Sequence, residues 1–156
     1  MTDTPPVRKG NGRVRIRVGL GATILGFMIY LLGAEPGLFG LDRSPVMGFV
    51  QLATVIVGLG IICLGGYISL AALWNGGQKS IASDIGLRLV STGYVIAVAC
   101  GMADIFGFGS NPYPKVPIFG IYQQVGFVIG EVVIGIGLML LIPYKKPQPK
   151  VGELPS

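Results

Sequence analysis

Residues 46–74 read VMGFVQLATVIVGLGIICLGGYISLAALW and contain no charged side chain. An α-helix rises about 1.5 Å per residue, so about 20 consecutive apolar residues cross the roughly 30 Å hydrocarbon core of a bilayer. The run exceeds that length. It therefore predicts a transmembrane helix that either tilts or projects from the hydrocarbon into the cytoplasm.

Three further apolar runs cover residues 18–34, 85–103 and 121–142, and Pro143 closes the last of them. Only 12% of the 156 residues are charged, whereas soluble domains usually carry about 25%. The sequence thus predicts an all-α membrane protein, a bundle of four transmembrane helices. For the first run a cleaved signal peptide is the alternative, because the run is short and follows basic residues.

The distribution of lysine and arginine predicts the orientation of the helices, because cytoplasmic loops are enriched in both residues. The tails at residues 1–17 and 143–156 are basic, whereas the loops expected on the opposite side carry only Arg43 and Lys115. We therefore expect a multi-pass protein of the inner (cytoplasmic) cell membrane. Its transmembrane domain, residues 18–142, lies between two cytoplasmic tails.

The two halves of the chain resemble each other. A shift of 67 residues places Gly26 on Gly93, and after a short insertion a shift of 72 places Gly58 on Gly130. The pattern predicts two duplicated helical hairpins. Because each hairpin begins on the same side of the membrane, the two are expected to be related by an axis along the membrane normal, as parallel repeats are.

Small residues recur on the helices at spacings that let two helix backbones approach closely. The packing positions that this pattern predicts are Gly58, Gly93, Ala97, Gly101, Gly126, Gly130 and Gly137. Two interpretations are open: contacts inside one bundle, or an interface between two copies of the chain.

Glu131 lies in the middle of the fourth apolar run. A carboxylate at this depth costs several kcal/mol unless it is paired or protonated. Tyr30 is expected at the outer membrane interface, where aromatic side chains gather. The partners expected for Glu131 are the neutral side chains of Thr54, Tyr67, Ser91, Thr92 and Tyr94. Glu131 is then either a structural link between helices or a functional group that binds a proton, an ion, a pigment or a quinone.

Asp84 and Arg88 are four residues apart where the third apolar run begins. An acidic residue complements the start of a helix, and a basic residue one turn later pairs with it. The pair is expected to anchor this helix end at the cytoplasmic surface.

Residues that commonly carry catalysis or bind metals are scarce. The chain has no histidine, and its two cysteines, Cys63 and Cys100, lie in apolar runs without metal-ligand spacing. We therefore expect no catalytic residue, no metal site and no cofactor. The net charge of +5 follows from the basic tails, so no nucleic-acid partner is expected.

These features predict a non-catalytic membrane protein, a small accessory or assembly subunit of a larger membrane complex. Its expected partners are the lipid bilayer and either other membrane subunits or further copies of the chain. The alternative is a small proton- or ion-coupled transporter that uses Glu131.

Overall fold

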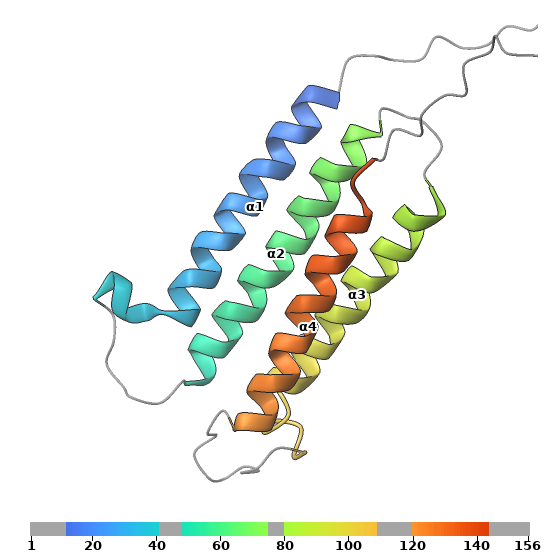
Figure 1. Ribbon diagram of the computed structural model, residues 1–156. Coiled ribbons are helices and arrows are strands. Elements are labelled where there is room, and N and C mark those ends of the chain that lie inside the picture. Colours follow the sequence, from blue (N-terminus) through green and yellow to red (C-terminus); the bar gives the residue numbers. More distant parts are fainter. Residues whose placement is uncertain (1–11, 41–47, 75–79, 109–119, 144–156) are drawn as a thin grey trace, which may run out of the picture.

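The computed structural model describes residues 12–40, 48–74, 80–108 and 120–143. In these residues the chain forms four α-helices and one short 3-10 helix, and no strand is present (Figure 1). Each α-helix is long and apolar enough to cross a membrane. The predicted all-α architecture, with four helices of membrane-spanning character, is confirmed. The elements in chain order are α1 (Gly12–Ala34), η1 (Pro36–Phe39), α2 (Phe49–Leu73), α3 (Ile81–Gly101) and α4 (Ile121–Leu140).

Helix α1 begins at Gly12 and so extends the first apolar run toward the N-terminus. Its first turns carry the exposed side chains of Arg13, Arg15 and Arg17. Arginine is a good helix former, so the chain stays helical although it is no longer apolar. The residues expected as a basic tail are therefore partly helical, and those before Gly12 lie outside the described residues.

Side chains cap the beginnings of the other three helices. The Ser80 hydroxyl accepts a hydrogen bond from the Ser83 amide at 3.2 Å and caps α3. At α2 and α4, the Oε1 atoms of Gln51 and Gln123 accept from the preceding backbone N–H groups of Gly48 and Gly120, both at 2.8 Å. Each glutamine thus satisfies one of the backbone donors that a helix start leaves unpaired.

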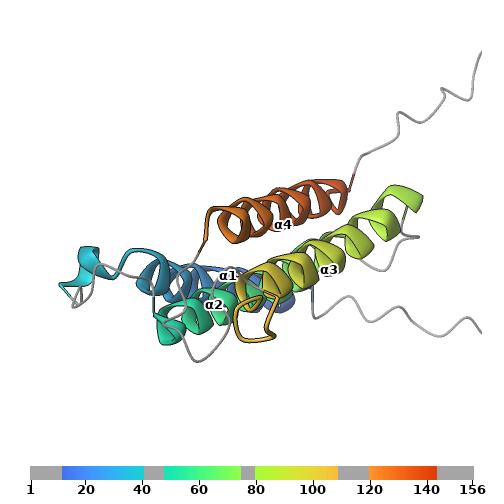
Figure 2. The ribbon, with the colours of Figure 1, turned by 90° about the horizontal axis from the view of Figure 1, so that it is seen from below.

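The four helices form two antiparallel hairpins. Helix α1 packs along α2, and α3 packs along α4. Helix α2 also contacts α3 and α4, whereas no Cα atom of α1 comes within 8 Å of one in α3 or α4. In Figure 2, which views the molecule from below, α4 lies apart from α1. Helix α2 is therefore the element that joins the two hairpins.

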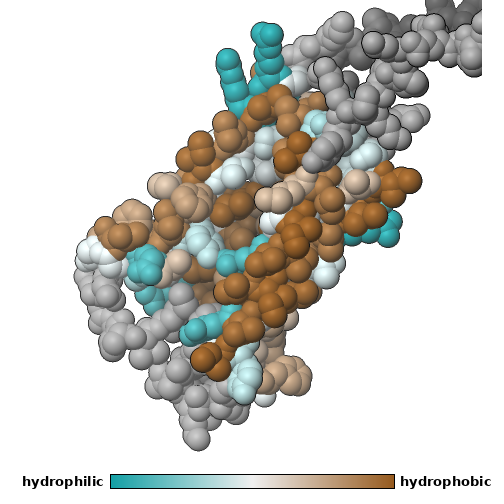
Figure 3. Space-filling model, viewed as in Figure 1, coloured by the Kyte–Doolittle hydropathy of each residue, from teal (hydrophilic) through white to brown (hydrophobic). Residues whose placement is uncertain are grey.

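The exterior of the bundle is apolar. Large hydrophobic side chains are exposed on all four helices, and Figure 3 shows a mainly hydrophobic surface over α1 and α4. Hydrophilic atoms project at the end of the bundle where α1 begins. An exposed apolar surface of this extent suits a protein surrounded by lipid tails.

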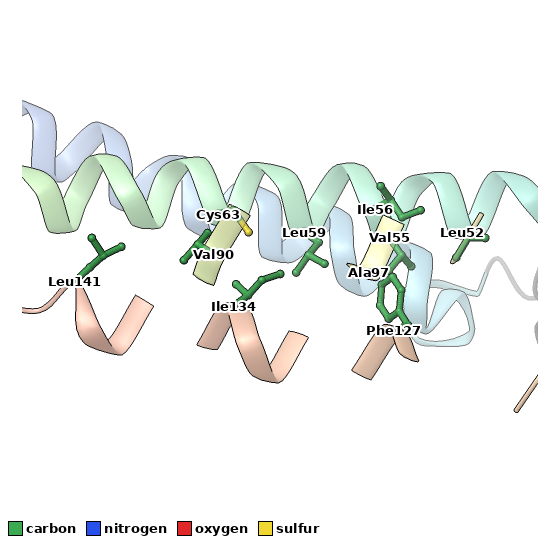
Figure 4. Close-up of a cluster of buried hydrophobic side chains, with 10 residues drawn as sticks. All are labelled: Leu52, Val55, Ile56, Leu59, Cys63, Val90, Ala97, Phe127, Ile134 and Leu141. Carbon is green, nitrogen blue, oxygen red and sulfur yellow. The ribbon is translucent and has the colours of Figure 1, made fainter. Parts of the chain in front are cut away.

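The core lies where α2 faces the second hairpin (Figure 4). Buried side chains of α2 face Phe127 and Ile134 of α4, and the cluster also includes Val90 and Ala97 of α3 and Leu141 just beyond α4. The α2 members are Leu52, Val55, Ile56, Leu59 and Cys63. Within this cluster the two hairpins are thus held together by packed side chains.

Candidate functional site at Glu131

Glu131 lies at mid-length of α4, and its side chain is half-buried. The Tyr30 hydroxyl donates a hydrogen bond to its Oε1 atom at 2.5 Å. Hydroxyl-to-carboxylate bonds of this length are among the stronger hydrogen bonds in proteins. The carboxyl group therefore has a partner from α1, a helix whose backbone makes no contact with α4.

Three of the partners expected for Glu131 bond elsewhere. Ser91 donates to the carbonyl of Leu87 on its own helix, and Thr54 likewise donates to that of Val50. Tyr94 donates across the hairpins, but to the Ile56 carbonyl at 3.3 Å. None of these three side chains bonds to Glu131.

The position of Tyr30 explains why it reaches Glu131. In Figure 1, α4 begins further along the bundle than α1 ends, so the middle of α4 is level with the last turns of α1. In addition, Tyr30 lies at a point of backbone contact with α2: a Cβ atom at Gly58 would lie 2.7 Å from the Tyr30 Cα. The tyrosine side chain then extends past α2 toward α4.

Only one of the two carboxyl oxygens has a partner within the described part of the chain. The bond from Tyr30 is the single hydrogen bond of the Glu131 side chain there, and no basic side chain pairs with it. The basic residue nearest to mid-span, Arg88, instead pairs with Asp84 at 3.3 Å. Both side chains of that pair are well exposed, so it is a surface ion pair of small energetic weight.

Glycines mediate the contact between α3 and α4. A Cβ atom at Gly130 would lie 2.7 Å from the Gly93 carbonyl oxygen and 3.0 Å from the Cβ of Ala97. One at Gly137 would lie 2.7 Å from the Gly86 carbonyl oxygen. Such distances leave no room for a side chain, so the two helix backbones touch at these positions.

The remaining predicted packing positions on these helices contact side chains. A Cβ atom at Gly126 would collide with the Cys100 Sγ atom. One at Gly101 would lie 3.3 Å from side-chain carbons of Leu52 and Ile56 on α2. The same Cβ would lie 3.5 Å from the Phe127 ring, so Gly101 faces side chains of both α2 and α4.

The same kind of contact joins α1 to α2, at glycines that were not among the predicted packing positions. A Cβ atom at Gly26 would lie 2.9 Å from the Gly58 carbonyl oxygen, and one at Gly19 would lie 2.8 Å from that of Gly65. Gly19, Gly26 and Gly33 are spaced by seven residues, and all three are buried. That spacing, two helical turns, is the signal in the sequence that predicts a single contact face.

Besides Tyr30–Glu131, two further hydrogen bonds given for the described residues cross between the hairpins. The Tyr94 hydroxyl of α3 reaches α2, as described above, and lies against Gly60. The Trp74 indole N–H, at the end of α2, donates to the Leu141 carbonyl beyond α4 at 3.0 Å. An aromatic side chain thus supplies the donor of each hydrogen bond that joins the two hairpins in the described residues.

The geometry around Glu131 is that of a polar link between helices. In the described residues no group of three or more His, Cys, Asp or Glu side chains is placed to hold a metal ion. Comparison with protein-family models, with curated proteins and with solved structures gives no match to this chain.

Proposed function

We propose that this chain is a non-catalytic membrane protein that acts as a small accessory or assembly subunit of a larger membrane complex. The observation that supports this most directly is the hydrogen bond from Tyr30 to Glu131. Polar side chains inside a membrane serve either a ligand pathway or helix association. Here one carboxyl oxygen is held by the protein's own phenol, as in helix association.

We also propose that the two hairpins arose by duplication. The contact of Gly26 with Gly58 in one hairpin corresponds to that of Gly93 with Gly130 in the other. In both hairpins a glutamine caps the second helix. In contrast, Leu59 stands where the repeat would place a second Glu131, so the polar link is specific to one half.

The proposed location is the cytoplasmic membrane, with both chain ends in the cytoplasm. Helix α1 begins, and α4 ends, at the same end of the bundle (Figure 1). The exposed arginines at the start of α1 lie at that end. The positive-inside rule then assigns this end to the cytoplasm.

The test is native mass spectrometry of the full chain, purified in mild detergent from the membrane of its own cell. A subunit is expected to copurify with other membrane proteins at fixed stoichiometry. The Glu131→Gln variant keeps a hydrogen-bond acceptor for Tyr30, so the chain itself is expected to fold and insert as the wild type does. If the wild-type chain is always isolated as a monomer, the proposal is wrong.

The alternative is a small proton- or ion-coupled transporter, and one observation favours it: the half-buried Glu131 carboxyl has an oxygen without a partner in the described residues. Transport by the purified chain in vesicles, driven by an imposed pH gradient and abolished by Glu131→Gln, would identify this function. No such flux is expected of an accessory subunit.

A further inference from the structure

The α1–α4 seam is the place where the two hairpins face each other without packing. We define it by Phe27 and Tyr30 of α1 and by Val128, Glu131 and Gly135 of α4. The α4 residues are spaced at i−3, i and i+4, so they share one helix face. Phe27 and Val128 are exposed, and the Tyr30–Glu131 hydrogen bond is the only one that crosses the seam in the described residues.

The opposite seam, between α2 and α3, is closed by the protein itself. A Cβ atom at Gly60 would lie 2.8 Å from the Tyr94 hydroxyl oxygen and 3.2 Å from the ring carbon that bears it. The tyrosine side chain therefore lies directly against the α2 backbone. In the repeat alignment Tyr94 of α3 corresponds to Phe27 of α1, and Gly60 of α2 corresponds to Val132 of α4. Phe27 and Val132 are both exposed, so the contact that closes the α2–α3 seam has no equivalent between α1 and α4.

Glu131 gives this open seam a specific chemistry. An ionised carboxylate has two oxygens and room for about four hydrogen bonds, and Tyr30 supplies one of them. At mid-membrane the ionised form costs several kcal/mol unless it is paired, and protonation is the other way to avoid that cost. No basic side chain in the described part of the chain pairs with Glu131. The group complementary to the ionised form is a cation from a second molecule that reaches the same depth.

The seam also has room for a helix beside the carboxyl group. A Cβ atom at Gly135, one turn beyond Glu131, would have no atom within 4 Å other than those of its own helix backbone and chain neighbours. A small residue beside a polar one allows a neighbouring helix to approach closely, which strengthens an interhelical hydrogen bond or ion pair.

We propose that a transmembrane helix of a partner subunit docks on the α1–α4 seam and that a lysine or arginine of that helix pairs with Glu131. The inference rests on the proposed function, since it names the surface and the chemistry by which this subunit joins its complex. Tyr30 acts as a positioning residue: its hydrogen bond holds Oε1, and the other carboxyl oxygen meets the partner's cation.

The test uses defined probes instead of the unidentified partner. The purified full chain is reconstituted in phosphatidylcholine vesicles with a dansyl-labelled single-span Leu/Ala peptide that has either Lys or Leu at its centre. Trp74, the only tryptophan of the chain, transfers energy to dansyl when the two associate. We expect the Lys peptide to bind at least tenfold more tightly than the Leu peptide.

Two variants are expected to abolish this preference. Glu131→Gln removes the charge, and Gly135→Leu blocks the helix approach while the carboxyl group remains. Two matched controls are expected to preserve it. Glu35→Gln removes an equal charge from an exposed position before η1, and Gly21→Leu adds the same side chain at an unobstructed glycine of α1. Circular dichroism checks that each variant is folded.

Equal binding of the two peptides, or a Lys preference that survives both seam variants, would overturn the inference. The result is separable from the proposed function. If subunits copurify with the chain but the Lys peptide shows no preference, only the seam assignment fails. If the chain purifies alone, the subunit function fails whatever the peptides do.

Discussion

The Tyr30 hydroxyl donates to Glu131 Oε1 at 2.5 Å across two helices whose backbones do not come into contact. Two long side chains meet here, one from each hairpin. Little water is present in the bilayer core to compete for the donor and the acceptor. A single bond of this kind therefore has a measurable effect on how the hairpins associate.

Tyr30→Phe is expected to lower the free energy of unfolding by roughly 1 kcal/mol, because it removes one interhelical hydrogen bond and keeps the ring. Unfolding is measured by titration with sodium dodecyl sulfate in mixed micelles. Tyr122→Phe is the control, since Tyr122 is 85% exposed and shows no hydrogen bond in the described residues. An equal loss in both variants would contradict a specific role for Tyr30.

Glu131→Ala is expected to cost roughly 1–2 kcal/mol, since it removes the acceptor and leaves the Tyr30 hydroxyl unpaired in an apolar environment. Glu131→Gln keeps a side chain of the same length with an oxygen that can accept from Tyr30. Its free energy of unfolding should lie within about 0.5 kcal/mol of that of the wild type. A Glu131→Gln variant that is as unstable as Glu131→Ala would show that the charge, rather than the hydrogen bond, holds the link.

Gly58→Ala and Gly130→Ala should each destabilise the bundle by about 1–3 kcal/mol, as overpacked cores do. Each new methyl group meets backbone atoms of the facing helix, at Tyr30 and at Gly93 respectively, and backbone cannot move aside. Gly21→Ala is the matched control, because its Cβ would meet no atom within 4 Å. The same detergent titration applies, and comparable losses at the two contact glycines would support the duplication.

The orientation can be tested at the two ends of α3. In a chain with Cys63→Ala and Cys100→Ala, Ile81→Cys and Phe108→Cys each introduce a single exposed thiol, since Ile81 is 83% and Phe108 89% exposed. A membrane-impermeant maleimide should label Phe108→Cys in intact cells and Ile81→Cys only after permeabilisation. Labelling of both thiols from outside would rule out a membrane-spanning α3.

The helices could be predicted from the sequence because membrane-spanning segments depend on hydropathy, which is a local property. Their ends could not, since they depend on hydrogen bonding. The Ser80 cap starts α3 before its apolar run begins, and α1 continues through Arg13 and Arg17 because arginine does not interrupt a helix.

The site was predicted only in part. Glu131 could be identified from its depth in an apolar run, but its partner depends on how far α4 is displaced along the bundle relative to α1, which hydropathy does not encode. Tyr30 therefore resembled an interface residue in the sequence. The contact glycines of α1 required a comparison of seven-residue spacings, since single glycines are common in membrane helices.

The pairing of helices also has a consequence for biosynthesis. In the described residues, glycines bring two helix backbones together only between α1 and α2 and between α3 and α4. The first hairpin can therefore close in the membrane before the second has left the ribosome. The Tyr30–Glu131 bond joins residues separated by 101 positions, so it can form only after α4 has been synthesised and inserted. Until then, the carboxyl-binding face of α1 is open to whatever the insertion machinery or a neighbouring nascent chain presents.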